Sequence, residues 1–165
     1  MLNELGLFAG INGIGLGLER AGLSHPACFV EFDSYAQKVL AKRYPEVPIW
    51  DDVRTFDGKP WKGHIDIISG GFPCQDISVA GKGKGIQEGT RSGLWLEFKR
   101  IISEVRPRFA VIENVPMLTV RGGTGVIADL AEIGYNAEWS VISAKGVGGC
   151  HLRKRMFIVA YPEKL

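Results

Sequence analysis

The sequence predicts an α/β fold, in which helices cover both faces of a mostly parallel β-sheet of the Rossmann-like type. Short, almost continuous apolar runs alternate with helix-length segments, as in buried parallel strands joined by crossover helices. Most of the 22 glycines gather at 6–22, 70–93, 122–125 and 146–149, where the chain would turn or approach a ligand. A chain of 165 residues that is 45% hydrophobic can bury one core, so a single domain over 1–165 is expected.

Four strands and two helices are expected in the first half of the chain. The strands are residues 5–9, 28–32, 47–53 and 65–69, and the helices are residues 13–21 and 34–43. Each strand is a short apolar run bounded by glycine, proline or acidic residues. The first helix follows a glycine turn, and the second is amphipathic, with Ser34 as its expected N-cap and Pro45 as its stop.

Two more helices and three more strands are expected in the second half of the chain. A crossover helix over residues 93–105 has apolar side chains at helical spacing: Leu94, Phe98, Ile101, Ile102 and Val105. The strands are residues 109–115, 137–143 and 156–161, and a further helix covers residues 126–133. This alternation completes the expected sheet.

Ligands of such sheets bind beyond the carboxyl ends of the strands, and here five expected strand ends carry unusual residues. The glycine-rich turn "LFAGINGIGLG" would let a cofactor approach backbone amides at a helix N-terminus, although it could be only a tight turn. Glu31 follows Gly13 by 18 residues, where an acid typically binds ribose hydroxyls. Together they favour a nucleoside-type cofactor. Phe32 could stack on a purine or belong to the core, and Asp52 could accept from an exocyclic amine or be a cap.

Cys74 is the candidate nucleophile. It follows a strand end and a proline in "GGFPCQ", where backbone amides can favour a thiolate. Cys28, inside a strand, is interpreted as a buried small hydrophobe, and Cys150 as incidental. The three cysteines match neither a disulfide framework nor a metal-binding pair, so no metal site is expected and a reducing compartment is the default.

Glu113, in "VIENVP", is the candidate general acid, because a carboxyl group at the end of an apolar strand is costly unless it is paired or used. A structural carboxylate is the alternative. Residues 79–93 hold Lys82, Lys84 and Arg91 among glycines, as in a basic lid over phosphates, or simply a solvated loop.

A second basic cluster, "HLRKRMF", precedes the last strand, where alternation would aim Arg153 and Arg155 the same way. The net charge of +2 is by itself too small to indicate a polyanionic partner. No run has membrane-spanning length and no secretory signal is recognisable, so an intracellular location, cytoplasmic or nucleoid-associated, is expected without a membrane partner. No Ser-His-Asp set suggests a hydrolase.

Taken together, these motifs resemble the C5-cytosine DNA methyltransferase family over nearly the whole chain. Three segments of this chain resemble the family's cofactor-binding motifs: "LFAGINGIGLGLERAG", "VEFDSYAQKVLAKRYPE" and "DDV". A fourth segment, "GGFPCQDISVAGKGKG", resembles its catalytic motif. "RSGLWLEFKRII", "ENV" and "HLRKRMFIVA" resemble the family's following motif, its acid motif and its paired-arginine motif. The Pro-Cys-Gln and Glu-Asn-Val signatures in this order are highly specific.

The resemblance implies an S-adenosylmethionine-dependent DNA (cytosine-5-)-methyltransferase. Cys74 would add to carbon 6 of a cytosine flipped out of double-stranded DNA, while Glu113 protonates N3. Arg153 and Arg155 would help hold the cytosine and its phosphate. The implied cofactor-binding residues are Phe8, Ala9, Gly10, Gly13, Glu31, Phe32, Asp52, Val53, Pro73 and Leu94. The implied DNA-binding residues are Gln75, Ser78, Lys82, Lys84, Arg91, Arg153 and Arg155.

The chain departs from the family pattern in four places. Gly6 stands where many relatives have aspartate, Asn12 where glycine is usual, and His151 where many have glutamine. The sequence also stops at Leu165, before the target-recognition region and the two C-terminal motifs of the family.

These departures leave other readings open. One is a truncated or split subunit that binds cofactor or DNA and needs a second chain for target recognition. Another is an RNA cytosine methyltransferase of the same family. A nicotinamide dehydrogenase would leave the Pro-Cys-Gln and Glu-Asn-Val signatures unexplained. The target sequence, the oligomeric state and membership of a restriction-modification system stay open.

Overall fold

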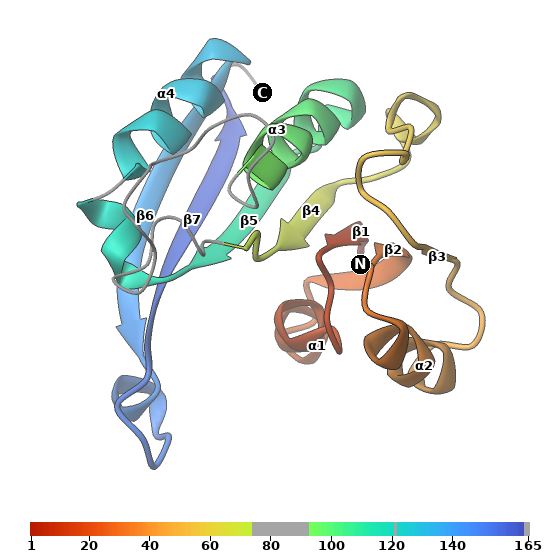
Figure 1. Cartoon of the computed structure of the whole chain (residues 1–165), viewed down its shortest axis with the longest axis horizontal. Coiled ribbons are helices and arrows are strands. Elements are labelled where there is room, and N and C mark those ends of the chain that lie inside the picture. The colour runs from red at the N-terminus through yellow and green to blue at the C-terminus, as the bar shows by residue number, and fades with distance from the viewer. Residues whose placement is uncertain (74–92, 121, 164–165) are drawn as a thin grey trace.

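A computed structural model describes residues 1–73, 93–120 and 122–163, which form one seven-stranded sheet (Figure 1). The strands are β1 (Leu2–Leu7), β2 (Ser24–Val30), β3 (Ile49–Trp50), β4 (Ile67–Gly70), β5 (Phe109–Asn114), β6 (Tyr135–Ser143) and β7 (Lys154–Pro162). Their order is β3-β2-β1-β4-β5-β7-β6. Strands β1 to β5 are parallel, and β7 runs antiparallel between β5 and β6. The predicted mostly parallel α/β sheet is confirmed.

Four α-helices of the described chain flank the sheet. They are α1 (Gly13–Arg20), α2 (Ser34–Arg43), α3 (Leu94–Val105) and α4 (Gly123–Glu132), with short 3-10 turns η1 (Lys59–Trp61), η3 (Pro116–Thr119) and η4 (Lys145–Val147). Helices α3 and α4 share one face, where Trp95 Nε1 and Lys99 Nζ donate hydrogen bonds to Asp129 at 2.7 and 2.8 Å. Helices α1 and α2 lie on the opposite face (Figure 1). None of the helices in the described ranges is long and apolar enough to cross a membrane.

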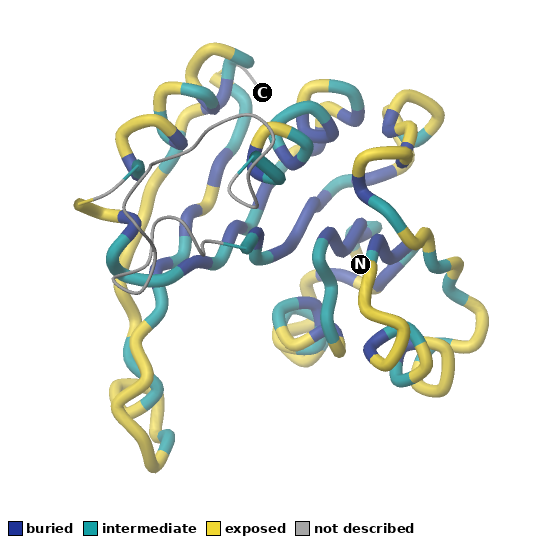
Figure 2. The backbone as a smooth tube through the Cα atoms, viewed as in Figure 1, coloured by how far each residue is buried: buried dark blue, intermediate teal, exposed yellow. Residues whose placement is uncertain are grey.

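The core lies between the sheet and α3. Five side chains of α3 are buried there: Trp95, Phe98, Ile101, Ile102 and Val105. Four of them had been predicted from helical spacing, and the fifth predicted residue, Leu94, is partly buried against the same core. Figure 2 shows the central strands buried, whereas the tip of the β6–β7 hairpin is exposed. The core therefore supports the centre of the sheet.

Several element boundaries differ from those predicted. Asp33, not Ser34, is the N-cap of α2, since its carboxylate accepts a hydrogen bond from the Ala36 amide at 2.8 Å. β1 ends at Leu7 because Phe8 turns out of the strand with a φ of 50°. β2 begins earlier than predicted and runs through Pro26, and β3 is only two residues long.

The end of β4 leaves no room for a side chain at Gly70. A Cβ there would lie 2.0 Å from the Leu7 carbonyl oxygen, which is backbone and cannot move aside cheaply. We expect Gly70→Ala to lower the free energy of unfolding by about 2–3 kcal/mol through overpacking. Urea unfolding would measure the loss. Gly17→Ala in α1 is the matched control, since a Cβ there meets nothing within 4 Å. Equal midpoints for Gly70→Ala and the wild type would contradict this packing.

Candidate active site

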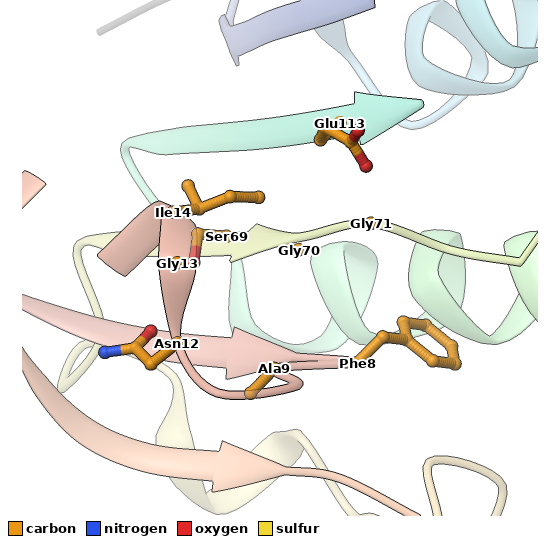
Figure 3. A pocket seen from close by; sticks show the side chains of 9 residues that line it. All are labelled: Phe8, Ala9, Asn12, Gly13, Ile14, Ser69, Gly70, Gly71 and Glu113. Carbon is orange, nitrogen blue, oxygen red and sulfur yellow. The ribbon is translucent and has the colours of Figure 1, made fainter. Parts of the chain in front are cut away.

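A cavity of about 180 Å³ opens at the carboxyl ends of the central strands (Figure 3). Its lining comes from the turn after β1, the end of β4 and the end of β5: Phe8, Ala9, Asn12, Gly13, Ile14, Ser69, Gly70, Gly71 and Glu113. The strand order reverses between β1 and β4, and open α/β sheets bind ligands at such a reversal. The cavity thus lies where the fold favours a ligand.

Strand register brings the three segments together. Leu7 of β1 pairs with Gly70 of β4, and Gly70 pairs with Ile112 of β5. The residues that follow these three, Phe8, Gly71 and Glu113, therefore lie at the same edge of the sheet, and all of them line the cavity. In Figure 3 the Glu113 carboxylate projects from β5 toward the glycines at the end of β4.

The turn between β1 and α1 has an unusual backbone. Phe8, Gly10 and Asn12 all have positive φ angles, of 50°, 54° and 63°. Helix α1 then begins at Gly13, and its N-cap makes no side-chain capping bond. Because the first amides of a helix have no partners within it, the amides at this end of the cavity can receive an anionic group.

Glu31, directly after β2, contacts this turn. Its Oε2 accepts a hydrogen bond from the Gly10 amide at 2.6 Å, and its Oε1 accepts one from the Asp33 amide at 2.8 Å. A carboxylate oxygen can accept more than one hydrogen bond, so Glu31 keeps capacity for a ligand hydroxyl. Phe32 beside it is 75% exposed, which contradicts a core position and leaves its ring open to stacking.

The other predicted cofactor residues of the described chain lie outside the cavity lining. Asp52 pairs with Arg54, with Oδ2 and Nη2 2.6 Å apart, and hydrogen bonds from Arg54 hold the pKa of Asp52 below its ordinary value. Val53 is buried, and its carbonyl accepts a hydrogen bond from Arg100. Pro73 is half-buried. These residues would contact only a ligand that extends beyond the cavity.

Glu113 forms an ion pair with Arg155, whose Nε lies 2.5 Å from Glu113 Oε1. Glu113 pairs with Phe157 in the β5–β7 ladder, and Arg155, two residues from Phe157, lies on the same face. Gly71 makes room for this carboxylate, since a Cβ there would lie 2.7 Å from Glu113 Oε2. Arg153, in contrast, is exposed just before β7. The structure thus brings one of the two predicted arginines to the acid.

Asn114 is a site residue that the predicted set lacked. It is buried, its Nδ2 donates to the Phe72 carbonyl at 3.1 Å, and its Oδ1 accepts from the Val115 amide at 2.8 Å. Asn114 therefore fixes the chain that leads from β4 toward Cys74. Its place in the Glu-Asn-Val signature, at the end of a central strand, could have indicated this role.

The thiols have different environments. Cys28 is buried, and desolvation raises its pKa to about 11, so its thiol stays protonated at neutral pH and is a poor nucleophile. Cys150 is exposed. The predicted nucleophile Cys74 lies outside the described residues, as do the predicted DNA-binding residues Gln75, Ser78, Lys82, Lys84 and Arg91. The interpretation of Cys28 as a buried hydrophobe is confirmed.

Comparison with solved structures supports the fold. The chain superposes with a TM-score of 0.80 and 28% identity on a candidate DNA modification methyltransferase encoded within an E. coli prophage, covering 99% of this chain and 47% of the other. The Spodoptera frugiperda DNMT2 mutant gives a TM-score of 0.82 at 21% identity, covering 100% and 51%.

Sequence comparison identifies the family. The type II methyltransferase M.CviJI of Paramecium bursaria Chlorella virus IL3A is 38% identical over 157 residues, which are 94% of this chain and 42% of that protein. M.Eco47II of Escherichia coli is 39% identical over 170 residues, covering 98% and 40%. The chain thus spans less than half the length of these two relatives. The model of the family C-5 cytosine-specific DNA methylase matches residues 2–165, and the chain belongs to that family.

Proposed function

We propose that this chain carries the catalytic centre of a DNA (cytosine-5-)-methyltransferase, which methylates carbon 5 of a flipped-out cytosine through a covalent adduct with Cys74. The main support is the arrangement at the carboxyl edge of the sheet. Glu113, paired with Arg155, borders a cavity built from the glycine turn, and the chain leaves that edge through Phe72 toward Cys74. An acid and a cofactor-type cavity thus share the edge of the sheet from which the chain continues toward Cys74.

The residues in and beside the cavity fit S-adenosylmethionine, which supplies a methyl group on a positively charged sulfur when bound. The amides at the start of α1 suit the carboxylate of its methionine part, and Glu31 suits its ribose hydroxyls. The exposed ring of Phe32 can stack on its adenine. Asp52 would receive the exocyclic amine, with its orientation fixed by Arg54.

The chemistry of cytosine assigns the catalytic roles. Carbon 5 is a poor nucleophile, so the Cys74 thiolate first forms a bond to carbon 6, while Glu113 delivers a proton to N3. Carbon 5 then has enamine character and would take the methyl group from the positively charged sulfur, so that the bond between sulfur and methyl breaks and S-adenosylhomocysteine is the leaving group. A base removes the proton from carbon 5, the bond between sulfur and carbon 6 breaks, and N3 returns its proton to Glu113, so that the Cys74 thiolate is released with neutral 5-methylcytosine.

A cytosine inside a duplex is out of reach of Cys74, so the target must leave the base stack. Arg155, held against Glu113, would bind the flipped base at the acid, and the exposed Arg153 would bind its phosphate. The basic residues Lys82, Lys84 and Arg91 would hold the backbone from the neighbouring segment. A DNA substrate implies that the protein acts inside the cell.

Removing the Glu31 carboxylate should weaken cofactor binding. Glu31→Ala loses the acceptor of the Gly10 amide and the proposed ribose contact, so affinity should fall by about 10- to 100-fold. Calorimetric titration with S-adenosylhomocysteine measures the change. Glu46→Ala, at an exposed glutamate, is the control and should bind like the wild type. Equal affinities of Glu31→Ala and the wild type would remove Glu31 from the cofactor site.

The reaction is tested by transfer of labelled methyl from S-adenosylmethionine to mixed-sequence duplex DNA, followed by digestion to nucleosides. The proposal expects label in 5-methylcytosine. Label in another nucleoside would contradict it, and a parallel reaction with RNA tests whether the substrate is RNA instead.

A further inference from the structure

Asn12 stands in the glycine turn, yet its side chain is buried and engaged. It is 2% exposed and has a φ of 63°, a left-handed conformation that glycine adopts most easily and asparagine more easily than most other residues. It is the N-cap residue of α1 and lines the cavity, but makes no capping bond. Its Nδ2 instead donates to Tyr44 Oη at 3.2 Å. The side chain thus connects the turn to a residue 32 positions away.

Tyr44 extends this connection. Its hydroxyl donates to Glu19 Oε2 of α1 at 3.2 Å, and its ring packs against Phe29 of β2 with centroids 5.3 Å apart. Arg43, its neighbour at the end of α2, donates to the Ile11 carbonyl at 3.4 Å. The end of α2 therefore holds the back of the turn at two successive residues, while Glu31 holds Gly10 from the other side.

Gly15 completes the arrangement. A Cβ there would lie 2.2 Å from Asn12 Oδ1, so a glycine in the first turn of α1 provides the space in which the Asn12 amide lies. The side-chain amide of Asn12 lies between Gly15 and Tyr44. These contacts hold the start of α1 in place relative to the end of α2.

We propose that Asn12 and Tyr44 are a positioning pair, which holds the turn and the first amides of α1 in the conformation that receives the cofactor. Glycine at position 12 would permit the same backbone angles but would remove the side-chain contact between the turn and Tyr44, leaving only the bond from Arg43 to the Ile11 carbonyl. The side chain of Asn12 therefore preorganises the site, and the loss of preorganisation lowers affinity. The role in cofactor binding rests on the function proposed above.

The test compares Asn12→Gly, Tyr44→Phe and the double variant with the wild type by calorimetric titration with S-adenosylhomocysteine. Each single variant should bind about 10-fold more weakly, as expected for the loss of one buried hydrogen bond. The loss of affinity in the double variant should be smaller than the sum of the two single losses, because both substitutions remove the hydrogen bond between Asn12 and Tyr44, although Tyr44→Phe also removes the one to Glu19. Tyr35→Phe, at a 74% exposed tyrosine in the first turn of α2, is the matched control and should bind like the wild type.

A second readout does not depend on the cofactor. Hydrogen exchange of the amides of residues 10–16 in the unliganded protein should become faster by about 10-fold in Asn12→Gly and in Tyr44→Phe, and stay unchanged in Tyr35→Phe. Wild-type affinity in Asn12→Gly, or additive losses in the double variant, would overturn the positioning role. Unchanged exchange would overturn it as well. A wild-type chain that fails to bind S-adenosylhomocysteine, although the variants alter exchange, would contradict the proposed function and confine the pair to fixing the turn.

Discussion

Replacing Cys74 with alanine is expected to abolish methyl transfer to DNA. Without the thiolate no bond forms to carbon 6, and carbon 5 stays too weak a nucleophile to take a methyl group. The rate of transfer should fall by at least about 1,000-fold, as is typical when a covalent nucleophile is removed. Single-turnover transfer of labelled methyl, with enzyme in excess over DNA, measures the loss.

Cys150→Ala is the matched control, because Cys150 is exposed and has no assigned role. It should methylate DNA at the wild-type rate. Retained turnover in Cys74→Ala would exclude the covalent route, and loss of activity in Cys150→Ala alone would transfer the nucleophile assignment to that residue.

Replacing Glu113 with glutamine should slow the chemical step by about 100- to 10,000-fold, the usual contribution of a general acid. Glutamine has nearly the same shape, so it fits beside Gly71, where space is limited. It cannot deliver the proton to N3, and it leaves Arg155 without its carboxylate partner. The single-turnover rate should therefore fall while the affinity for S-adenosylhomocysteine changes by less than about 3-fold.

Glu138→Gln provides the comparison for Glu113. Glu138 also projects from a strand of the sheet, where its Oε1 accepts a hydrogen bond from the exposed Tyr161 hydroxyl at 3.0 Å. This variant should keep the wild-type rate. If Glu113→Gln also keeps it, Glu113 is a structural carboxylate that orients Arg155.

Local patterns predicted most of the fold. The helical spacing of apolar residues identified α3 and its buried face, and continuous apolar runs identified the strands. The exact ends of the helices and strands were harder to predict from the sequence, because they depend on single hydrogen bonds. Asp33 and Ser34 are both good N-caps, and only the contact between the Asp33 carboxylate and the Ala36 amide decides between them.

Site residues that lie at strand ends could be predicted from the sequence. Contacts between residues of different strands or helices could not. Glu113 could be placed at the ligand-binding edge because it ends an apolar strand in an α/β pattern. Its pairing with Arg155 depends on β7 entering antiparallel beside β5, and no spacing in the sequence encodes that register. The contact between Asn12 and Tyr44 likewise depends on how α2 packs against the turn.

The covalent adduct is the central claim, and a duplex that contains 5-fluorocytosine tests it most directly. Fluorine cannot leave carbon 5 as a proton does, so methyl transfer should leave the DNA joined to Cys74. The mass of the denatured protein is then measured under conditions in which an ordinary duplex is methylated. We expect the chain to gain the mass of the methylated strand when S-adenosylmethionine is present, and Cys74→Ala to gain none. A chain that methylates ordinary DNA but forms no denaturation-resistant complex with the fluorinated duplex would contradict the account.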